Sequence, residues 1–188
     1  MKNYQLWLIC LVTLLLSACA NKPSTQAWLT KDISINLPSA GLNQAYHDQQ
    51  LLTFHYHDKQ NSLITVVDAD AQSLNVVGLS TLGIRLFNIE YRDNHIKTEQ
   101  NIFIKELPSA SQILSDIMLS IYPLEQWQSV LPTGWQLVDE KLHRKLLNPQ
   151  RDVIIDITYL QPPSSQMRKP ILIEHHIFGY QINIESME

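Results

Sequence analysis

The sequence predicts an α+β protein, mainly β, in which a curved antiparallel sheet of about ten strands forms a half-barrel and two short helices cap its concave face. Two observations support this prediction. Apolar residues alternate with polar ones over most of the chain from Ile33 onward, which is typical of strands with one buried face. After Pro108 the pattern changes once to a helical spacing. So large a sheet tends to curl, and the helices need an apolar surface to cover.

The first half of the sheet is predicted as a series of hairpins. In chain order, the expected strands cover residues 33–37, 52–57, 63–67, 74–79, 84–91 and 96–99. The expected turns between them lie at residues 58–61, 68–72 and 92–94. These connections are too short for a crossover helix, so neighbouring strands are expected to run antiparallel.

Two helices are predicted after this meander. The first carries apolar residues with the spacing of one helical face: Ile113, Leu114, Ile117, Met118, Ile121 and Tyr122. Pro123 ends it, because the residue before a proline is pushed out of the helical region. The second runs from Leu124 to Leu131 with Trp127 pointing inward, and stops before Pro132 and Gly134.

Alternation resumes after Gly134 and predicts the second half of the sheet. The expected strands cover residues 135–138, 142–147, 153–159 and 171–176, followed by a last strand that carries Tyr180, Ile182 and Ile184. A turn is expected at residues 148–151, and a Pro-rich loop at residues 161–166.

The N-terminus has the features of a secretory signal peptide, expected to cover residues 1–18. Lys2 precedes an apolar run from Leu6 to Leu16, which is shorter than the about 20 residues that a membrane span needs. The ending Leu16-Ser17-Ala18-Cys19 resembles the bacterial lipobox. That resemblance implies cleavage before Cys19 and attachment of lipid to its thiol, so that acyl chains anchor the protein.

Localisation follows from the same resemblance. Lipoproteins that stay in the inner membrane typically carry Asp after the lipidated cysteine, and here Ala20 follows it. We therefore expect the periplasmic face of the outer membrane. Residues 19–30 would be the lipidated N-terminus and a short polar tether, and residues 31–188 a single globular domain.

Composition limits the partners. The net charge is −4 and no basic cluster occurs, which argues against nucleic-acid binding, because that needs Lys and Arg to displace counterions. Cys10 lies in the signal peptide, so the mature chain would keep only Cys19 and could form no internal disulfide.

Several segments resemble a family of uncharacterised bacterial outer-membrane lipoproteins, often encoded near acyl-chain or aryl-polyene biosynthesis genes. They are residues 113–119, Tyr122-Pro123-Leu124 with Trp127, residues 142–146 and Gly179-Tyr180. That family is similar in layout to the lipoprotein-localisation carrier and receptor proteins, the LolA/LolB group. The resemblance implies a curved antiparallel sheet, capped by helices, around an apolar cavity for acyl chains. As an analogy of fold, it says little alone about function.

Polar clusters give no catalytic or metal pattern. His55 and His57 share a strand face, and His175-His176 do not; all four are interpreted as solvent-facing strand residues rather than zinc ligands. Asp68 and Asp70 are interpreted as a solvated turn, and Asp152 and Asp156 as the exposed face of their strand. No Gly-x-Ser-x-Gly elbow and no phosphate loop occur. We therefore expect no enzyme, no cofactor and no metal site.

The candidate ligand-cavity residues are apolar and face the interior expected between sheet and helices. They are Phe87, Ile89, Tyr91, Ile117, Ile121, Trp127, Ile155, Ile157, Tyr159 and Tyr180. The same alternation would serve a filled core or a hollow one, and the sequence leaves both open.

Two functions are carried forward. The first is a periplasm-facing outer-membrane lipoprotein that binds or shuttles an acylated ligand, with a lipid, a lipoprotein or a periplasmic carrier protein as partner. The alternative is a structural or assembly lipoprotein with a packed core that acts through protein–protein contacts.

Overall fold

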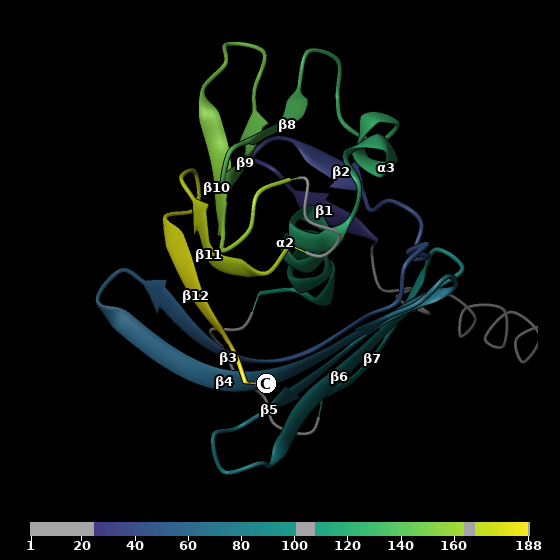
Figure 1. Cartoon of the computed structure of the whole chain (residues 1–188), viewed down its shortest axis with the longest axis vertical. Helices are drawn as coiled ribbons and strands as arrows, with labels where there is room; N and C mark the ends of the chain where they lie inside the picture. Colours follow the sequence, from purple (N-terminus) through teal and green to yellow (C-terminus); the bar gives the residue numbers. More distant parts are fainter. Residues whose placement is uncertain (1–24, 101–107, 164–167, 188) are drawn as a thin grey trace, which may run out of the picture.

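The computed structural model describes residues 25–100, 108–163 and 168–187. Its main element is one antiparallel sheet of ten strands, strongly curved, with a helix lying inside the curve (Figure 1). The half-barrel architecture predicted from the sequence is confirmed.

The described elements have the following bounds. The strands before the helices are β1 (Gln26–Trp28), β2 (Ser34–Asn36), β3 (Tyr46–Tyr56), β4 (Lys59–Ala69), β5 (Ser73–Leu79), β6 (Arg85–Arg92) and β7 (His95–Gln100). The helices are α2 (Ala110–Ile121) and α3 (Leu124–Gln128). The later strands are β8 (Gln136–Glu140), β9 (His143–Leu147), β10 (Val153–Tyr159), β11 (Pro170–His175) and β12 (Tyr180–Ser186).

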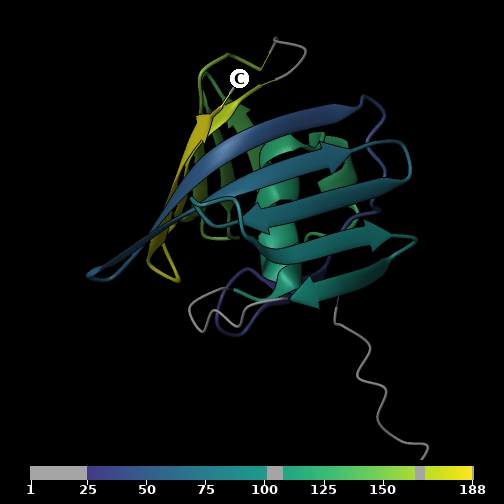
Figure 2. The same cartoon turned by 90° about the horizontal axis from the view of Figure 1, so that it is seen from below.

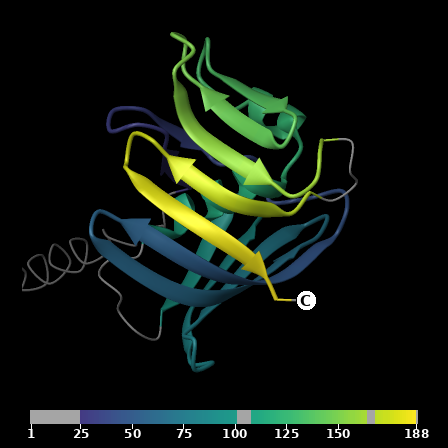
Figure 3. The same ribbon diagram turned by 60° about the vertical axis from the view of Figure 1, so that its left-hand side comes forward.

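The sheet consists of two meanders. They are joined where the first strand of the sheet in chain order, β3, pairs with the last, β12. The strand order is β7-β6-β5-β4-β3-β12-β11-β10-β9-β8. β3 and β12 pair from Tyr56↔Tyr180 to Gln50↔Ser186 (Figure 3). The meander of β3 to β7 covers one side of α2 (Figure 2), and the meander of β8 to β12 lies on another (Figure 1). The β3–β12 pairing therefore sets the angle between the two meanders, and α2 lies inside that angle.

A separate two-stranded sheet occupies part of the expected tether. β1 pairs with β2, and Ala27 and Leu29 are fully buried in the main core. The Trp28 N–H donates a hydrogen bond to Gln112 Oε1 on α2 at 3.1 Å. Residues 25–30 thus belong to the folded domain, because their apolar side chains find a buried surface beside α2.

Other expected boundaries were wrong by a few residues. β3 begins at Tyr46, six residues before the expected start, because Asp48 and Gln50 on its inward face interrupt the apolar alternation. The β3–β4 turn has two residues, His57 and Asp58, instead of four, and His57 adopts the positive φ of 51° that such tight hairpins need. α3 ends at Gln128.

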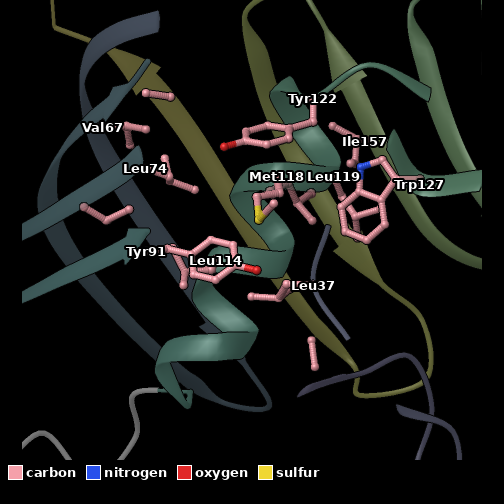
Figure 4. Close-up of a cluster of buried hydrophobic side chains, with 14 of the residues drawn as sticks. Leu37, Val67, Leu74, Tyr91, Leu114, Met118, Leu119, Tyr122, Trp127 and Ile157 are labelled. Atoms are coloured by element: carbon pink, nitrogen blue, oxygen red, sulfur yellow. The ribbon is translucent and has the colours of Figure 1, made fainter. Parts of the chain in front are cut away.

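α2 carries two apolar faces. Its fully buried face, Leu114, Met118 and Leu119, packs into the core together with Tyr91 and Trp127 (Figure 4). At the N-terminus, the Ser109 hydroxyl accepts the Gln112 N–H, which is the usual cap for an otherwise unpaired helix donor.

The C-terminal end of α2 is held by the second meander. Arg144 Nη1 on β9 donates to the carbonyl oxygens of Leu119 and Tyr122, at 2.9 and 2.7 Å. The Tyr159 hydroxyl on β10 donates to the Ser120 carbonyl at 2.7 Å. The last carbonyls of a helix have no partner within it, so these side chains satisfy groups that would otherwise be buried without one. They also fix the position of the helix against the sheet.

We expect Arg144→Met to lower the free energy of unfolding by about 3 kcal/mol, because it leaves two helix carbonyls unpaired and removes a buried partner of Asp139. Urea denaturation followed by circular dichroism measures the loss. Lys145→Met on the same strand is the control, because Lys145 bonds Glu140 near the surface and should contribute less than about 1 kcal/mol. Equal losses in both variants would contradict this account of the helix end.

Candidate functional site

An apolar pocket of about 80 Å³ lies between α2 and the concave face of the sheet. Thirteen of its eighteen described lining residues are Leu, Ile, Val, Phe or Pro. The apolar residues are Leu52, Phe54, Leu63, Val67, Phe87, Pro108, Ile113, Ile117, Ile121, Pro170, Ile173, Ile182 and Ile184. The polar ones are Tyr46, Gln50, Thr65, Asp116 and Ser120. The interior is thus neither wholly filled nor widely hollow: a packed core adjoins a small apolar space.

The helix supplies one wall through its second apolar face. Ile113, Ile117 and Ile121 are four residues apart, so they lie on one line along α2. All three are only partly buried, in contrast to Leu114 and Met118 on the adjoining face. The core therefore holds the helix by one face, and the pocket lies against the other.

The opposite wall comes from neighbouring strands at matched register. Leu52 pairs with Leu63 on β4 and with Ile184 on β12, which places three apolar side chains in one row across the sheet. Closer to the β5–β6 side, the Phe87 ring lies over Gly78, where an added Cβ would come within 2.3 Å of a ring atom. Gly78 thus lets Phe87 lie close to the sheet, at the edge of the pocket.

The pocket wall changes from polar to apolar along β3. Its inward side chains at the start of the strand form a buried network: Gln50 Nε2 donates to Asp48 Oδ2 at 2.7 Å and to the Tyr46 hydroxyl at 3.2 Å. The Ser186 hydroxyl on β12 donates to the other Asp48 oxygen at 2.7 Å. Further along β3 the inward residues are Leu52 and Phe54. The pocket therefore has a polar end and an apolar end.

Asp116 is a buried acid on the helix wall. The Tyr180 hydroxyl donates to its Oδ2 at 2.7 Å, and Gln112 Nε2 lies 3.4 Å from its Oδ1. Burial raises the pKa of Asp116 to about 7, and the hydrogen bonds from Tyr180 and Gln112 offset only part of that effect. The carboxyl group is thus protonated in much of the folded protein near neutral pH.

Thr65 presents a different polar feature on the sheet wall. It is 2% exposed and lies directly opposite Gln50 in the β3–β4 register. Its hydroxyl has no hydrogen-bond partner in the protein. Buried hydroxyl groups are nearly always paired, so an unpaired one beside a pocket points to a partner outside the chain.

The ten residues proposed from the sequence fall into three groups. Phe87, Ile117 and Ile121 line the pocket. The packed core holds six others, each at most 2% exposed: Ile89, Tyr91, Trp127, Ile155, Ile157 and Tyr159. Tyr180 is 7% exposed and bonds Asp116 behind the pocket wall. Cys19, the proposed lipidation site, lies outside the described residues.

Sequence reasoning missed the five polar lining residues of the pocket, which are Tyr46, Gln50, Thr65, Asp116 and Ser120. Little in the local pattern separates these positions from solvent-facing ones. The sole signal was the interruption of alternation before Leu52, where Asp48 and Gln50 stand at inward positions.

The histidines were expected on the solvent-facing side of their strands. This was wrong for His175, which is 1% exposed and packs on Phe178 and Tyr180. Burial, with a smaller effect from the charge of His176, lowers the pKa of His175 to about 4. Within the described ranges, no group of three or more His, Cys, Asp or Glu side chains gathers in a way that could hold a metal ion.

The aspartates that the sequence analysis assigned to a turn and to an exposed strand face make local contacts. Asp70 accepts the backbone N–H groups of Gln72 and Ser73 in the β4–β5 turn, and these bonds lower its pKa. Asp68 is paired with His47. Asp156 contacts His143 at 2.8 Å, and Asp152 accepts a hydrogen bond from Asn148.

Among the helices of the described residues, none is long and apolar enough to cross a membrane.

A family model described as a protein of unknown function (DUF3261) matches residues 47–188. The matched stretch contains the ten strands of the large sheet, with β3 from its second residue, and seventeen of the eighteen described lining residues of the pocket. It leaves out β1, β2 and the lining residue Tyr46. No curated protein matches the chain.

We expect Asp116→Asn to stabilise the protein at pH 8 by about 2–4 kcal/mol and to change it little at pH 4. Between about pH 4 and pH 7 the unfolded carboxyl group is ionised while the folded one keeps its proton. Stability is therefore lost as pH rises through this range, and an amide, which does not ionise, avoids the loss.

Urea denaturation at pH 4, 6 and 8 measures this difference. Asp58→Asn, in the exposed β3–β4 turn, makes the same chemical change without burial and should shift stability by less than about 0.5 kcal/mol. A gain from Asp116→Asn that is the same at every pH would show that Asp116 is not held in its neutral form.

Proposed function

The chain belongs to the DUF3261 family of proteins of unknown function, and from its pocket and sequence we propose that it is a periplasm-facing lipoprotein of the outer membrane that binds an acylated ligand. It does so without catalysing a reaction. The lipid on Cys19 anchors it, and its partners are an acyl-bearing lipid or lipoprotein and a periplasmic carrier protein that exchanges the ligand with it.

The observation that carries this proposal is the pocket between the second face of α2 and the sheet. Most of its lining residues are apolar, and Ile113, Ile117 and Ile121 on the helix are only partly buried. An acyl chain placed there would complete their burial. Each CH₂ group that leaves water contributes about 0.8 kcal/mol, so a chain of moderate length gains enough to bind.

The volume of the pocket limits how much of an acyl chain can enter without a movement of side chains. An apolar cavity of about 150 Å³ can bind benzene, and the pocket described above has about half that volume. It receives the first part of a chain, and a longer chain has to displace the partly buried side chains of Ile113, Ile117 and Ile121. We therefore propose that α2 covers the pocket and that its isoleucine side chains move to admit a chain. The C-terminal end of α2 stays fixed by its hydrogen bonds to Arg144 and Tyr159.

The layout adds support by analogy. A curved antiparallel sheet with a helix in its concave face is the arrangement expected from the similarity to the LolA/LolB carriers and receptors. Because unrelated functions share folds, this similarity raises the plausibility of acyl-chain binding and carries no residue roles.

The rival proposal is an assembly lipoprotein that acts through its outer surface. The observation that favours it is the extent of packing: Tyr91, Tyr122 and Trp127 are large side chains that are fully buried in the core. This protein would bind no acyl ligand, and its partners would be other envelope proteins.

For the anchor, we expect Cys19→Ser to abolish the incorporation of labelled palmitate, because one thiol carries the lipid. Cys10→Ser is the matched control and should leave labelling intact, since Cys10 lies in the proposed signal peptide. Labelling that survives Cys19→Ser would disprove this lipidation site.

For the pocket, we expect Leu63→Trp to weaken acyl-ligand binding about tenfold, because the indole takes the space in which the chain would lie. The full chain carrying Cys19→Ser is suitable, since no covalent lipid can then be mistaken for a bound one. Native mass spectrometry with glycerol monododecanoate as the probe measures occupancy.

The control for this experiment is Leu142→Trp, which adds the same side chain at an exposed position in the β8–β9 turn. It should bind like the parent protein. If the parent binds no probe, or if both variants bind equally, the acyl-binding proposal is wrong and the assembly role becomes the better account.

A further inference from the structure

We infer that the pocket selects acyl chains whose head is an uncharged ester or amide, that Thr65 donates a hydrogen bond to the carbonyl oxygen of this linkage, and that free fatty-acid anions are excluded. This inference rests on the proposed function and deepens it, because it names the class of ligand.

The first argument is the charge of the wall. Among the eighteen described lining residues there is no Lys, Arg or His, and one lining residue, Asp116, is an acid. A carboxylate moved from water into an apolar site loses its hydration, and only a paired cation or several hydrogen bonds can offset that loss. The described lining offers no such cation, so the anion of a fatty acid is disfavoured.

Arg144 and Arg168 are not lining residues of the pocket, although Nε and Nη2 of Arg168 are buried without a hydrogen-bond partner. Arg144 and Arg168 both bond Asp139 and lie beside Tyr159, which is not a lining residue. Lys169 Nζ bonds Ser186 at the exposed end of β12. Their arrangement offers a ligand head inside the pocket no positive charge.

The second argument is the unpaired hydroxyl of Thr65. On the opposite strand, both N–H groups of Gln50 are used by Asp48 and Tyr46. Thr65, a lining residue whose buried hydroxyl has no partner in the protein, is therefore the available donor on this row of the wall. An ester or amide carbonyl accepts such a bond and carries no charge.

The test compares three ligands with the same twelve-carbon chain at pH 8, where a carboxylic acid is ionised. They are dodecanoate, glycerol monododecanoate and an N-dodecanoyl dipeptide amide. Affinities are measured by isothermal titration calorimetry on the full chain carrying Cys19→Ser. The ester stands for glycerolipids and the amide for acylated proteins, so their relative affinities distinguish the two natural sources.

We expect the ester, the amide or both to bind at least about tenfold more tightly than dodecanoate. Thr65→Val keeps the shape of the side chain without the hydroxyl, and it should weaken the preferred ligand about five- to tenfold while leaving dodecanoate unchanged. Thr65→Ser, which keeps the hydroxyl, should retain the preference.

Thr53→Val is the matched control. Thr53 lies on the other face of β3, where its hydroxyl bonds Ser62, and this variant should bind like the parent. Thermal unfolding of each variant verifies that it is folded.

Two outcomes would overturn the inference while sparing the proposed function: equal binding of all three ligands, or an affinity for the preferred ligand that Thr65→Val leaves unchanged. Failure of the parent protein to bind any of the three would instead overturn both.

Discussion

The position of α2 inside the curved sheet depends on the hydrogen bonds that β9 and β10 make to its C-terminal carbonyl groups. Arg144 and Tyr159 bind three of these carbonyls from one side, and Leu114, Met118 and Leu119 bury the adjoining face in the core. Because the helix is held by its end and by one face, the line of Ile113, Ile117 and Ile121 is only partly buried and lies along the pocket. The pocket thus follows from how the helix is attached.

The same apolar alternation builds both the core and the pocket wall, and this limits what sequence can predict. The sheet, its curvature and α2 followed from periodicity, because burial of one face imposes period two on strands and a regular stripe on a helix. Which apolar residues face open space depends on register, as in the row of Leu52, Leu63 and Ile184. The sequence could not predict Thr65 and Asp116 as pocket residues for the same reason, because their burial depends on strands and helices that are distant in the chain.

Polar residues make the two ends of the pocket chemically different. The network of Tyr46, Asp48 and Gln50 satisfies itself at one end, and Leu52 and Phe54 continue the strand as an apolar surface. Among the described lining residues, Thr65 is the one with a buried polar side-chain atom that has no hydrogen-bond partner. A ligand with a single neutral polar group and a long apolar part matches this order better than a fully apolar molecule, which leaves Thr65 unsatisfied, or a charged one, which finds no counter-ion.

The pairing of β3 with β12 has a consequence for how the molecule folds. These strands are separated by most of the chain, yet their contact joins the two meanders into one sheet. While the polypeptide emerges from a ribosome or a translocation channel, β3 to β7 can form hairpins, but β3 keeps an unpaired edge until the last strand arrives. Long-range strand pairing is slow, and an exposed edge invites pairing with other chains. The protein is therefore most prone to aggregation during its synthesis, before β12 has formed. A chaperone that covers the edge of β3 at that stage would do most to prevent aggregation.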